Sequence, residues 1–381
     1  MITFAVLDEI VFILDNYLKS QWGTPLAGRL GQMAYPAIFT RPALPGGTWI
    51  FTAQERLTAA GREMAVLAYE AIARSGGRAL NHPSRVVERY ELLRSLNATG
   101  ANRFRAARVS EYEGGLRFPV FVREENEHSG SLTRLLRSES ELRAALAYLR
   151  LRGFAAEELL IVEFCDTADS QGRFRKYSAY FLDGEVLPRH LHVSSDWVAK
   201  SADSLLDETF AAEEVRYIVE NPHESYLRHV FHSARIEYGR ADYGMLGDEP
   251  QIWEINTAPT ISTSAHPRRR TPELLRFRAL ERPGQAHFHE RFRRALEAID
   301  SQPETKAEVP LPIPSDLVAR WRAELRDQAR RTRRRRMLSR LGRFQAMRAL
   351  RTRAEPAILR LLERSRSRQR EDRVFSGKRA P

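Results

Sequence analysis

The sequence predicts a mixed fold of helices and strands that ends in a strongly basic helical extension. Two observations predict the mixed fold. Stretches with the apolar spacing of helices alternate with short runs of aromatic and β-branched residues, and turn signals typical of antiparallel hairpins separate the last of these runs. A third observation sets the extension apart: residues 315–381 hold 22 Lys and Arg against 7 Asp and Glu, a balance of +15. The formal charge of the whole chain is +12, so 12 − 15 leaves −3 for residues 1–314. The body is slightly acidic, and its chemistry need not involve a polyanion.

Length and composition bound the architecture. The 381 residues exceed the usual size of one hydrophobic core, and 43% of them are apolar, so two or three packed units are expected. Asp8 and Glu9 interrupt the apolar N-terminus, and no basic segment precedes it, which argues against a signal peptide or a membrane span. We therefore expect a cytoplasmic protein. The single cysteine, Cys165, allows no intrachain disulfide.

The first 80 residues are expected to form an N-terminal α/β region. The chain opens with an apolar run that indicates a strand followed by a helix, "MITFAVLDEIVFIL". A Pro/Gly-rich loop comes next, and residues 53–77 have the apolar spacing and the Gly-Gly ending of a long helix.

From residue 81 onward, helical and strand patterns alternate. Apolar periodicity predicts helices over 84–96 and 138–153, the second with Ser138 and Glu141 placed for a capping box. Aromatic and β-branched content predicts strands over 118–124, 158–167, 176–193 and 252–256, the third of them bent by the turn signal Asp183-Gly184. Residues 266–305 look helical, and "EVPLPIPSD" at 308–316 reads as a stiff proline-spaced linker.

The last strand, "IWEIN", places two oxygen-bearing side chains together. Glu254 and Asn256 are two residues apart, so in an extended chain they project from the same face. Asp242 lies twelve residues before Glu254, and the turn-forming stretch "LGDEP" separates them, which puts Asp242 on a neighbouring antiparallel strand. Three oxygen ligands would then converge, a set that suits Mg²⁺. The alternative interpretation is a partly exposed strand with ordinary polar residues.

Two other stretches have features of a nucleotide site. Arg123 ends an apolar strand, and the small-residue turn Ser129-Gly130-Ser131 follows it, an arrangement that can bind phosphate. The apolar run "LLIVEFCDT" ends in Glu163 and Asp166, which could provide a slot for a base and an acceptor for ribose hydroxyls. A solvated edge charge and an ordinary loop are the alternatives for the first stretch.

The order and spacing of these residues resemble the ATP-grasp superfamily, in which two α+β subdomains clasp ATP between them. The resemblance runs from about residue 81 to residue 260. Its most specific element is Asp242 followed by Glu254-Ile255-Asn256, which is similar to the family's magnesium-binding Asp and Glu-x-Asn. The resemblance implies an α+β fold of the ATP-grasp type, with ATP and Mg²⁺ as cofactors.

The resemblance also implies roles for further residues. The residues similar to nucleotide-binding positions are Arg89 at a helix start, Arg123 after the "P-V-x-V" strand, the lid-like turn Ser129, Gly130 and Ser131, and the hinge from Glu163 through Phe164 to Asp166. Arg189 is similar to an arginine that faces the reacting phosphoryl group. Two of these positions, Arg89 and Arg123, usually carry lysine in the family, and this chain has 56 arginines against five lysines. We attribute the difference to a general arginine preference and expect ATP binding to survive.

Several polar residues near this site have less specific assignments. Candidates for holding a carboxylate or positioning an amine are Lys176, His190, His192, Lys200 and Arg240. Arg240 is favoured as a catalytic residue because it lies two positions before Asp242, and Lys176 is grouped with the cofactor-binding residues. For each of the five, a structural role is the alternative.

The function implied by the resemblance is ATP-dependent ligation. A substrate carboxylate would attack the γ-phosphorus of ATP, and an amine would capture the acyl phosphate to give an amide or peptide bond. Lid closure would exclude water from that intermediate. Two alternatives stay open: a phosphotransferase of the same fold that acts on a small molecule, and a nucleotide-binding scaffold that uses its basic tail.

The expected organisation has five segments. They are an N-terminal region over 1–80, a small subdomain with the phosphate loop over 81–160, a large subdomain with the metal site over 161–265, a helical extension and linker over 266–314, and the Arg-rich helical tail over 315–381. In the tail, Leu338, Leu341, Phe344, Met347 and Leu350 fall near an i, i+3 spacing with arginines between them. Such a helix could contact an anionic membrane or nucleic acid, or pack its apolar stripe on the body.

Overall fold

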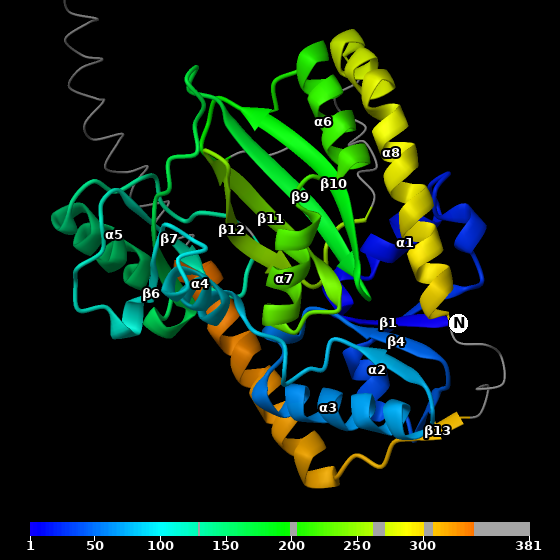
Figure 1. Ribbon diagram of the computed structural model, residues 1–381. Coiled ribbons are helices and arrows are strands. Elements are labelled where there is room, and N and C mark those ends of the chain that lie inside the picture. Colours follow the sequence, from blue (N-terminus) through cyan, green and yellow to red (C-terminus); the bar gives the residue numbers. More distant parts are fainter. Residues whose placement is uncertain (129, 199–203, 262–270, 301–307, 339–381) are drawn as a thin grey trace, which may run out of the picture. The chain divides into compact units, whose positions relative to one another are not determined.

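The computed structural model describes residues 1–128, 130–198, 204–261, 271–300 and 308–338 (Figure 1). Chain contacts divide the protein into two units. The first comprises residues 1–142 and 156–326, and the second comprises 143–155 and 327–381. No helix among the described residues is long and apolar enough to cross a membrane.

The N-terminal part of the first unit is a parallel sheet with the strand order β2-β1-β4-β5. Its strands are β1 (Ile2–Val6), β2 (Leu30–Ala34), β4 (Thr48–Phe51) and β5 (Arg78–Leu80). The accompanying helices are α1 (Phe12–Leu18), α2 (Tyr35–Thr40) and α3 (Ala59–Arg74). The side chain of Thr58 accepts a hydrogen bond from the Gly61 amide and caps α3, so the predicted long helix begins later than its pattern suggested. The predicted α/β character of this region is confirmed.

The predicted linker over 308–316 is instead partly a strand. β13 (Glu308–Pro310) pairs antiparallel with β3 (Ala43–Pro45), and the side chains of Val309 and Leu311 are buried. The proline spacing suggested an extended chain correctly, but it could not show that the apolar residues between the prolines would join a core. A helix over 315–338 follows, and Trp321 on it packs edge-on against Phe39 with ring centroids 5.3 Å apart.

A small antiparallel sheet with the order β6-β8-β7 follows in the chain. Its strands are β6 (Ala106–Arg108), β7 (Val120–Glu124) and β8 (Leu159–Glu163). The helices of this region are α4 (Arg89–Ala98) and α5 (Glu139–Leu151). The Ser138 hydroxyl accepts a hydrogen bond from the Glu141 amide at 3.3 Å, as the predicted capping box requires.

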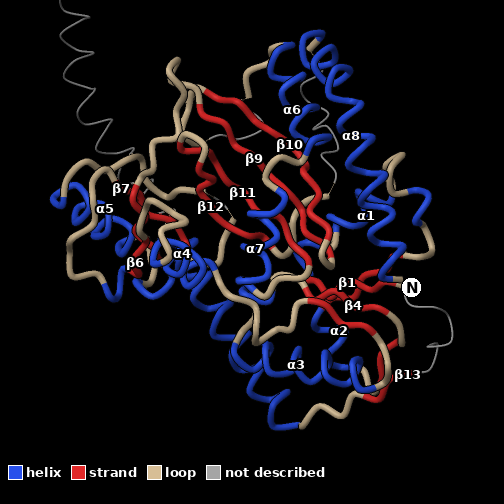
Figure 2. The backbone as a smooth tube through the Cα atoms, in the orientation of Figure 1, coloured by secondary structure: helices blue, strands red, loops and turns tan. Residues whose placement is uncertain are grey.

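The large sheet is antiparallel with the order β10-β9-β11-β12, and Figure 2 shows its four strands side by side. The strands are β9 (Phe174–Leu182), β10 (Glu185–Ser194), β11 (Tyr238–Leu246) and β12 (Glu249–Asn256). The turn between β9 and β10 has positive φ at Asp183 and Gly184, as the predicted bend requires. The associated helices are α6 (Glu208–Glu220), α7 (Glu224–Ala234) and α8 (Pro272–Ile299).

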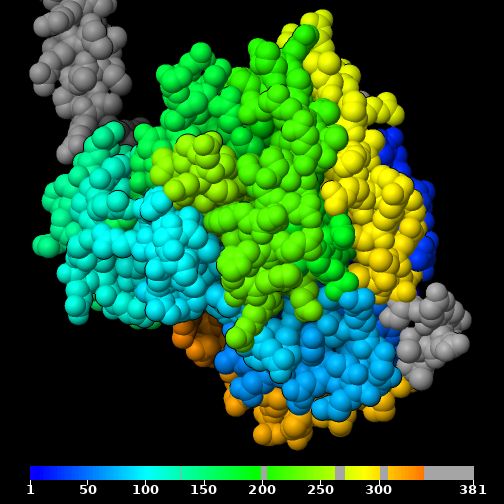
Figure 3. Space-filling model, viewed as in Figure 1, coloured from blue at the N-terminus to red at the C-terminus, as the bar shows by residue number. Residues whose placement is uncertain are grey.

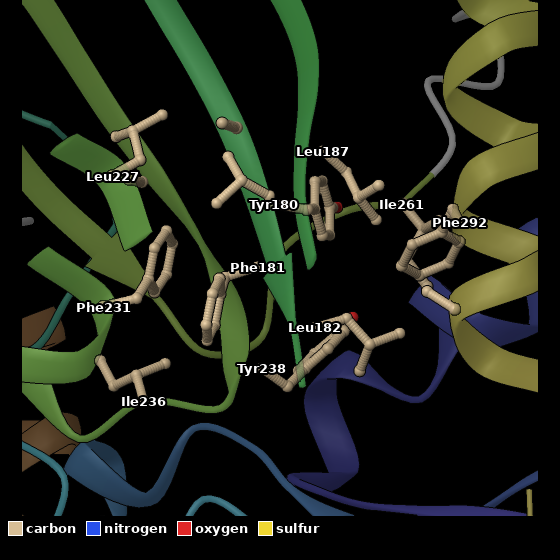
Figure 4. Packing of buried hydrophobic residues seen from close by; sticks show 14 of the residues in the cluster. Tyr180, Phe181, Leu182, Leu187, Leu227, Phe231, Ile236, Tyr238, Ile261 and Phe292 are labelled. Atoms are coloured by element: carbon tan, nitrogen blue, oxygen red, sulfur yellow. The ribbon is translucent and has the colours of Figure 1, made fainter. Parts of the chain in front are cut away.

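Adjacent residues of β9 face opposite sides of the large sheet. Phe181 stacks on Phe231 of α7 with ring centroids 4.8 Å apart, whereas Tyr180 lies 5.6 Å from Phe292 of α8 (Figure 4). This alternation is the ordinary period of a strand. The central strands are therefore apolar on the α7 side, and the other side is available for polar residues farther along each strand.

Helix α8 runs beside α6, and both segments form part of the surface in Figure 3. Gly284 allows the close approach, because a Cβ at this position would lie 3.2 Å from the Cα of Val215. Gln285, the next residue, consequently reaches Glu214 on α6 and donates a hydrogen bond to it at 3.0 Å.

A buried asparagine joins the N-terminal sheet to the large sheet. The Asn81 side chain donates to the carbonyls of Phe51 at 3.0 Å and Tyr238 at 2.8 Å. Its Oδ1 atom accepts from the amides of Glu237 and Tyr238 at 2.8 and 3.0 Å. Asn81 also has φ +63°, a left-handed conformation that asparagine tolerates better than most residues.

The described part of the second unit combines the end of α5 and the loop after it with the basic helix. The guanidinium of Arg335 lies over the ring of Phe154 at 3.7 Å from its centroid. Of the predicted apolar stripe only Leu338 belongs to the described residues; Leu341, Phe344, Met347 and Leu350 lie outside them.

Candidate functional site

The predicted hairpin of Asp242 and Glu254 is confirmed. Strands β11 and β12 pair antiparallel, with Asp242 directly opposite Glu254 and Arg240 directly opposite Asn256. The register shifts just after Asp242, where β12 has one extra residue. All four side chains therefore share one face of the sheet, because cross-strand partners and residues two apart lie on the same side.

Two cations hold the carboxylate of Asp242, whose side chain is 2% exposed. The Lys176 ammonium lies 2.6 Å from Oδ2, and the Arg240 guanidinium donates to Oδ1 at 2.8 Å and to Oδ2 at 3.2 Å. Burial alone would raise the pKa of Asp242, but Arg240 and Lys176 outweigh that effect and lower it. Asp242 is consequently ionised at neutral pH.

A different pair of cations holds Glu254. Arg89, the first residue of α4, and Arg123, near the end of β7, each place Nη2 at 2.6 Å from the same oxygen, Oε2. Burial would raise the pKa of Glu254, but the two arginines outweigh it and hold the pKa well below its ordinary value. The tertiary fold thus brings the two predicted phosphate-binding arginines against a predicted metal ligand.

Both arginines have a buried donor without a partner. The Nε atoms of Arg89 and Arg123 are inaccessible to solvent and have no hydrogen-bond acceptor among the described residues. Leaving a buried charged donor without an acceptor costs about 1–3 kcal/mol or more. Two such donors therefore lie beside one carboxylate without an acceptor among the described residues.

The oxygen donors of this face fit a hard divalent cation. Asp242, Glu254 and Asn256 supply carboxylate and amide oxygens, the ligand type that Mg²⁺ takes, and a cation would replace the arginine and lysine contacts of the carboxylates. The Asn256 Oδ1 atom already accepts from the Ala258 amide at 2.8 Å. No group of three or more His, Cys, Asp or Glu side chains placed to hold a metal occurs in the described parts of the chain. The metal role of the three residues stays a prediction.

Sequence reasoning missed three further residues near Glu254, namely Glu55, His128 and Thr257. His128 lies between two glutamates, with Nδ1 3.8 Å from Oε1 of Glu254 and Nε2 3.5 Å from Oε1 of Glu55. Thr257 donates to Oε2 of Glu55 at 3.0 Å, so the N-terminal region reaches the site. Glu55 gave no sequence signal because it follows β4, far from the other residues in the chain. Thr257 could have been noticed, since it directly follows Asn256.

The predicted lid turn is described in part. Ser129 lies outside the described residues, and Gly130 has a positive φ of +90°. Ser131 pairs with Arg123 as an isolated bridge, and the Leu132 amide donates to the Val122 carbonyl at 2.7 Å. The turn therefore folds back along β7, beside Arg123.

The predicted hinge residues have different surroundings. The Glu163 side chain is 1% exposed and accepts hydrogen bonds from the side chains of both Arg105 and Arg117. Burial would raise the pKa of Glu163, but hydrogen bonds from Arg117 and Arg105 outweigh it and lower the pKa. The exposed carboxylate of Asp166 accepts from the Ala168 amide at 3.1 Å. The ribose contact by Glu163 and Asp166 stays a prediction, and Glu163 would have to share its carboxylate with both arginines.

Phe164 is part of an aromatic cluster. Its ring lies 5.8 Å from that of Trp197 and 6.3 Å from that of Phe174, and Trp197 also lies 5.0 Å from Phe121. Rings from four separate segments offer an apolar surface of the kind that a planar base packs against. Trp197 had no sequence signal of its own, because only the tertiary fold brings it to Phe164.

Arg189 lies at the edge of the sheet and contacts α8. Its Nη1 atom donates to Oε1 of Gln285, its Nη2 atom donates to the Ile261 carbonyl at 3.4 Å, and its guanidinium lies 4.7 Å from the centroid of Phe288. Among the described residues, no hydrogen bond joins Arg189 to Asp242 or Glu254. Its predicted contact with a phosphoryl group stays a prediction, whereas Lys176 and Arg240 do contact Asp242. Lys200 lies outside the described residues.

Searches against family models and curated proteins gave no match, but solved structures did match. D-alanine–D-alanine ligase from Bacillus anthracis, complexed with ATP, has 12% identity and a TM-score of 0.42, covering 78% of this chain and 97% of that chain. The Coxiella burnetii enzyme has 11% identity and a TM-score of 0.44 over 78% and 98%. A RimK domain protein described as ATP-grasp, from Sphaerobacter thermophilus, has 12% identity and a TM-score of 0.38 over 75% and 97%.

The fold of this chain is α+β, with a parallel N-terminal sheet followed by two antiparallel sheets. The roles of individual residues rest on the contacts described above.

Proposed function

We propose that this protein is an ATP- and Mg²⁺-dependent ligase that activates a substrate carboxylate as an acyl phosphate and joins it to an amine, releasing ADP. One observation carries the proposal. Two buried arginines with unpartnered Nε donors lie against Glu254, directly across the hairpin from the ion-paired Asp242. The ATP-grasp ligases to which the chain is similar give the reaction class.

The site residues fall into three groups according to the part of the Mg²⁺–ATP complex that each would bind. Arg89 and Arg123 would bind the phosphates, and their Nε donors would gain acceptors when an anion binds. The aromatic cluster at Phe164 would pack against the base. Asp242, Glu254 and Asn256 would hold Mg²⁺, which when bound would neutralise charge on the transferred phosphoryl group.

Loss of the ion pairs at Asp242 would give Lys176 and Arg240 a role in binding. If Mg²⁺ takes Asp242, then Lys176 and Arg240 lose their carboxylate partner and become free to stabilise an anionic group above the same sheet face. Arg240 would contact the transferred phosphoryl group there, in keeping with its position beside Asp242. No enzyme nucleophile is needed for acyl transfer through a mixed anhydride.

Isothermal titration of ATP tests the nucleotide site, with Mg²⁺ in one series and with EDTA in the other. The wild type should bind more tightly with Mg²⁺, and the double variant Glu254→Ala, Asn256→Ala should lose that Mg²⁺-dependent gain, by about tenfold or more in affinity. Glu249→Gln is the matched control, because Glu249 lies on the same strand but is exposed and pairs with Arg103. Absence of ATP binding in the wild type would contradict the proposal.

The reaction class needs a second measurement. ADP release should require an acid, and hydroxylamine should capture the activated acid as a hydroxamate. ADP release with an alcohol, without hydroxamate, would indicate the alternative phosphotransferase. ATP binding without ADP release under any substrate mixture would favour the nucleotide-binding scaffold, which could act through the basic residues 315–381 on a membrane or nucleic acid.

A further inference from the structure

A second polar cluster lies on the same sheet face, next to Asp242. Ser178 of β9 pairs with Asp242 on one side and with His190 of β10 on the other, so it lies between them in the sheet. Its side chain is fully buried, and its Oγ atom has no hydrogen-bond partner. A buried hydroxyl without a partner is destabilising, and it is unusual in a strand at the centre of a sheet.

Two histidines continue the cluster toward the sheet edge. The rings of His190 and His192 stack with centroids 4.2 Å apart and an interplanar angle of 18°. Leu191, which lies between the two histidines in the chain, and Val193, which follows them, are buried on the opposite face of the sheet. Because side chains alternate along a strand, the two rings lie on the same face as Asp242. Within the described residues, neither ring takes part in a hydrogen bond. A histidine with a purely structural role is normally fixed by one.

The charges around the two rings are mostly positive. Lys176 pairs with His192 across β9 and β10, and Arg189, Arg240 and the carboxylate of Asp242 also act on the two rings. Burial, followed by the nearby charge of Lys176, lowers the pKa of His192 to about 3. Burial and the neighbouring His192 lower that of His190 well below its ordinary value.

Neutral rings have one N–H donor each. At neutral pH the cluster therefore offers a hydroxyl, two imidazole N–H groups and the ammonium of Lys176, while two cations occupy the carboxylate of Asp242. An ammonium group would be repelled by Lys176, Arg189 and Arg240. An anionic oxygen group would satisfy the donors that lack partners.

We propose that Ser178, His190 and His192 form a subsite for the carboxylate of the acid substrate. The inference rests on the proposed function, which places the reacting phosphate at the neighbouring Asp242. A carboxylate held by these three side chains would lie on the same sheet face as the metal ligands, one strand away from Asp242. Lys176 and Arg240 would add charge to the subsite once they are released from Asp242.

Histidine NMR signals give a test that does not depend on catalysis. The probes are acetate, succinate, D-alanine, L-glutamate and inorganic phosphate, each added with and without Mg²⁺ and a non-hydrolysable ATP analogue. The variants His190→Asn and His192→Asn assign the Cε1–H signals, and His229, exposed on α7, is the internal control. At least one carboxylate should shift the signals of His190 and His192 and leave that of His229 unchanged.

Variants measure the strength of the subsite by calorimetry. Ser178→Ala and the double variant His190→Asn, His192→Asn should each weaken binding of the active carboxylate about tenfold, as expected for loss of hydrogen bonds to a charged group. His229→Asn should bind it as the wild type does.

Three outcomes would overturn the subsite. They are no shift of either histidine signal with any probe, unchanged affinity in the variants, and a preference for inorganic phosphate over every carboxylate, which would assign the cluster to phosphate instead. Failure of the proposed function is distinguishable, because the wild type would then not bind ATP with Mg²⁺, whatever the carboxylates do to the histidines.

Discussion

Asp242 and Glu254 lie directly opposite each other on β11 and β12, yet separate pairs of cations neutralise their carboxylates. Lys176 and Arg240 hold the first, and Arg89 and Arg123 hold the second. Two like charges on opposed residues repel, so the pairs stabilise this part of the hairpin without a metal. Because each carboxylate relies on its own pair of cations, the stability of this hairpin should depend on every one of these side chains.

Removal of the Asp242 charge should destabilise the fold. Asp242→Asn leaves Lys176 and Arg240 without their carboxylate, and breaking a buried ion pair costs about 3–5 kcal/mol of unfolding free energy. The double variant Asp242→Asn, Lys176→Met should recover part of this loss, because one uncompensated cation is gone. Urea unfolding of the three proteins checks this. Equal stability of wild type and Asp242→Asn would contradict the ion-pair account.

The two arginines that contact Glu254 should differ in their tolerance of lysine. Arg89 donates to Glu254 and also to the carbonyls of Glu124 at 3.2 Å and Glu127 at 3.0 Å, which one ammonium cannot reproduce. Arg89→Lys should therefore lower the unfolding free energy by roughly 2–3 kcal/mol. Arg123→Lys is the matched comparison and should cost less than about 1 kcal/mol, since its strongest contact is the one with Glu254. The reverse order would disprove this reading of their contacts.

Because of Glu214, the free energy of unfolding should decrease as the pH rises. Burial, together with the neighbouring Glu281, raises the pKa of Glu214 to about 8, whereas the unfolded value is near 4.5. Between these values the folded state binds the proton and the unfolded state does not, so the free energy of unfolding decreases with rising pH and levels off above about pH 8.

Glu214→Gln should flatten that dependence, because glutamine resembles the protonated carboxyl group. Urea unfolding at several pH values from 5 to 9 measures it, with Glu213→Gln as the neighbouring control. Parallel curves for wild type and Glu214→Gln would refute the assignment.

Asn81 should be among the least replaceable residues outside the site. Asn81→Ala removes four hydrogen bonds to buried backbone groups of Phe51, Glu237 and Tyr238, and it puts alanine at a φ of +63°. The expected loss is on the order of 3–5 kcal/mol in unfolding free energy. Asn97→Ala, which removes one hydrogen bond to the Asn102 carbonyl, is the control and should cost about 1 kcal/mol. Similar losses in both variants would show that Asn81 does not join the sheets.

Much of the site was visible in the sequence because local patterns carry it. The period of a strand put Glu254 and Asn256 on one face, and the turn signal before them put Asp242 on the paired strand, as the register confirms. The turn at Asp183 and Gly184 and the capping box at Ser138 were equally local, since a few neighbouring residues set their backbone conformation.

What only the tertiary structure decided is which distant groups meet. His128 lies between Glu55 and Glu254, so residues from the N-terminal region and from the segment after β7 meet at this point, and no sequence spacing encodes those contacts. Residues 308–310 of the proline-spaced stretch became a strand of the N-terminal core for the same reason. By itself the sequence determined the local conformation of the chain and the set of carboxylate and amide side chains on one face of the hairpin. The partners of each charge depended on packing between segments, which is cooperative over the whole fold and leaves no periodic trace in the sequence.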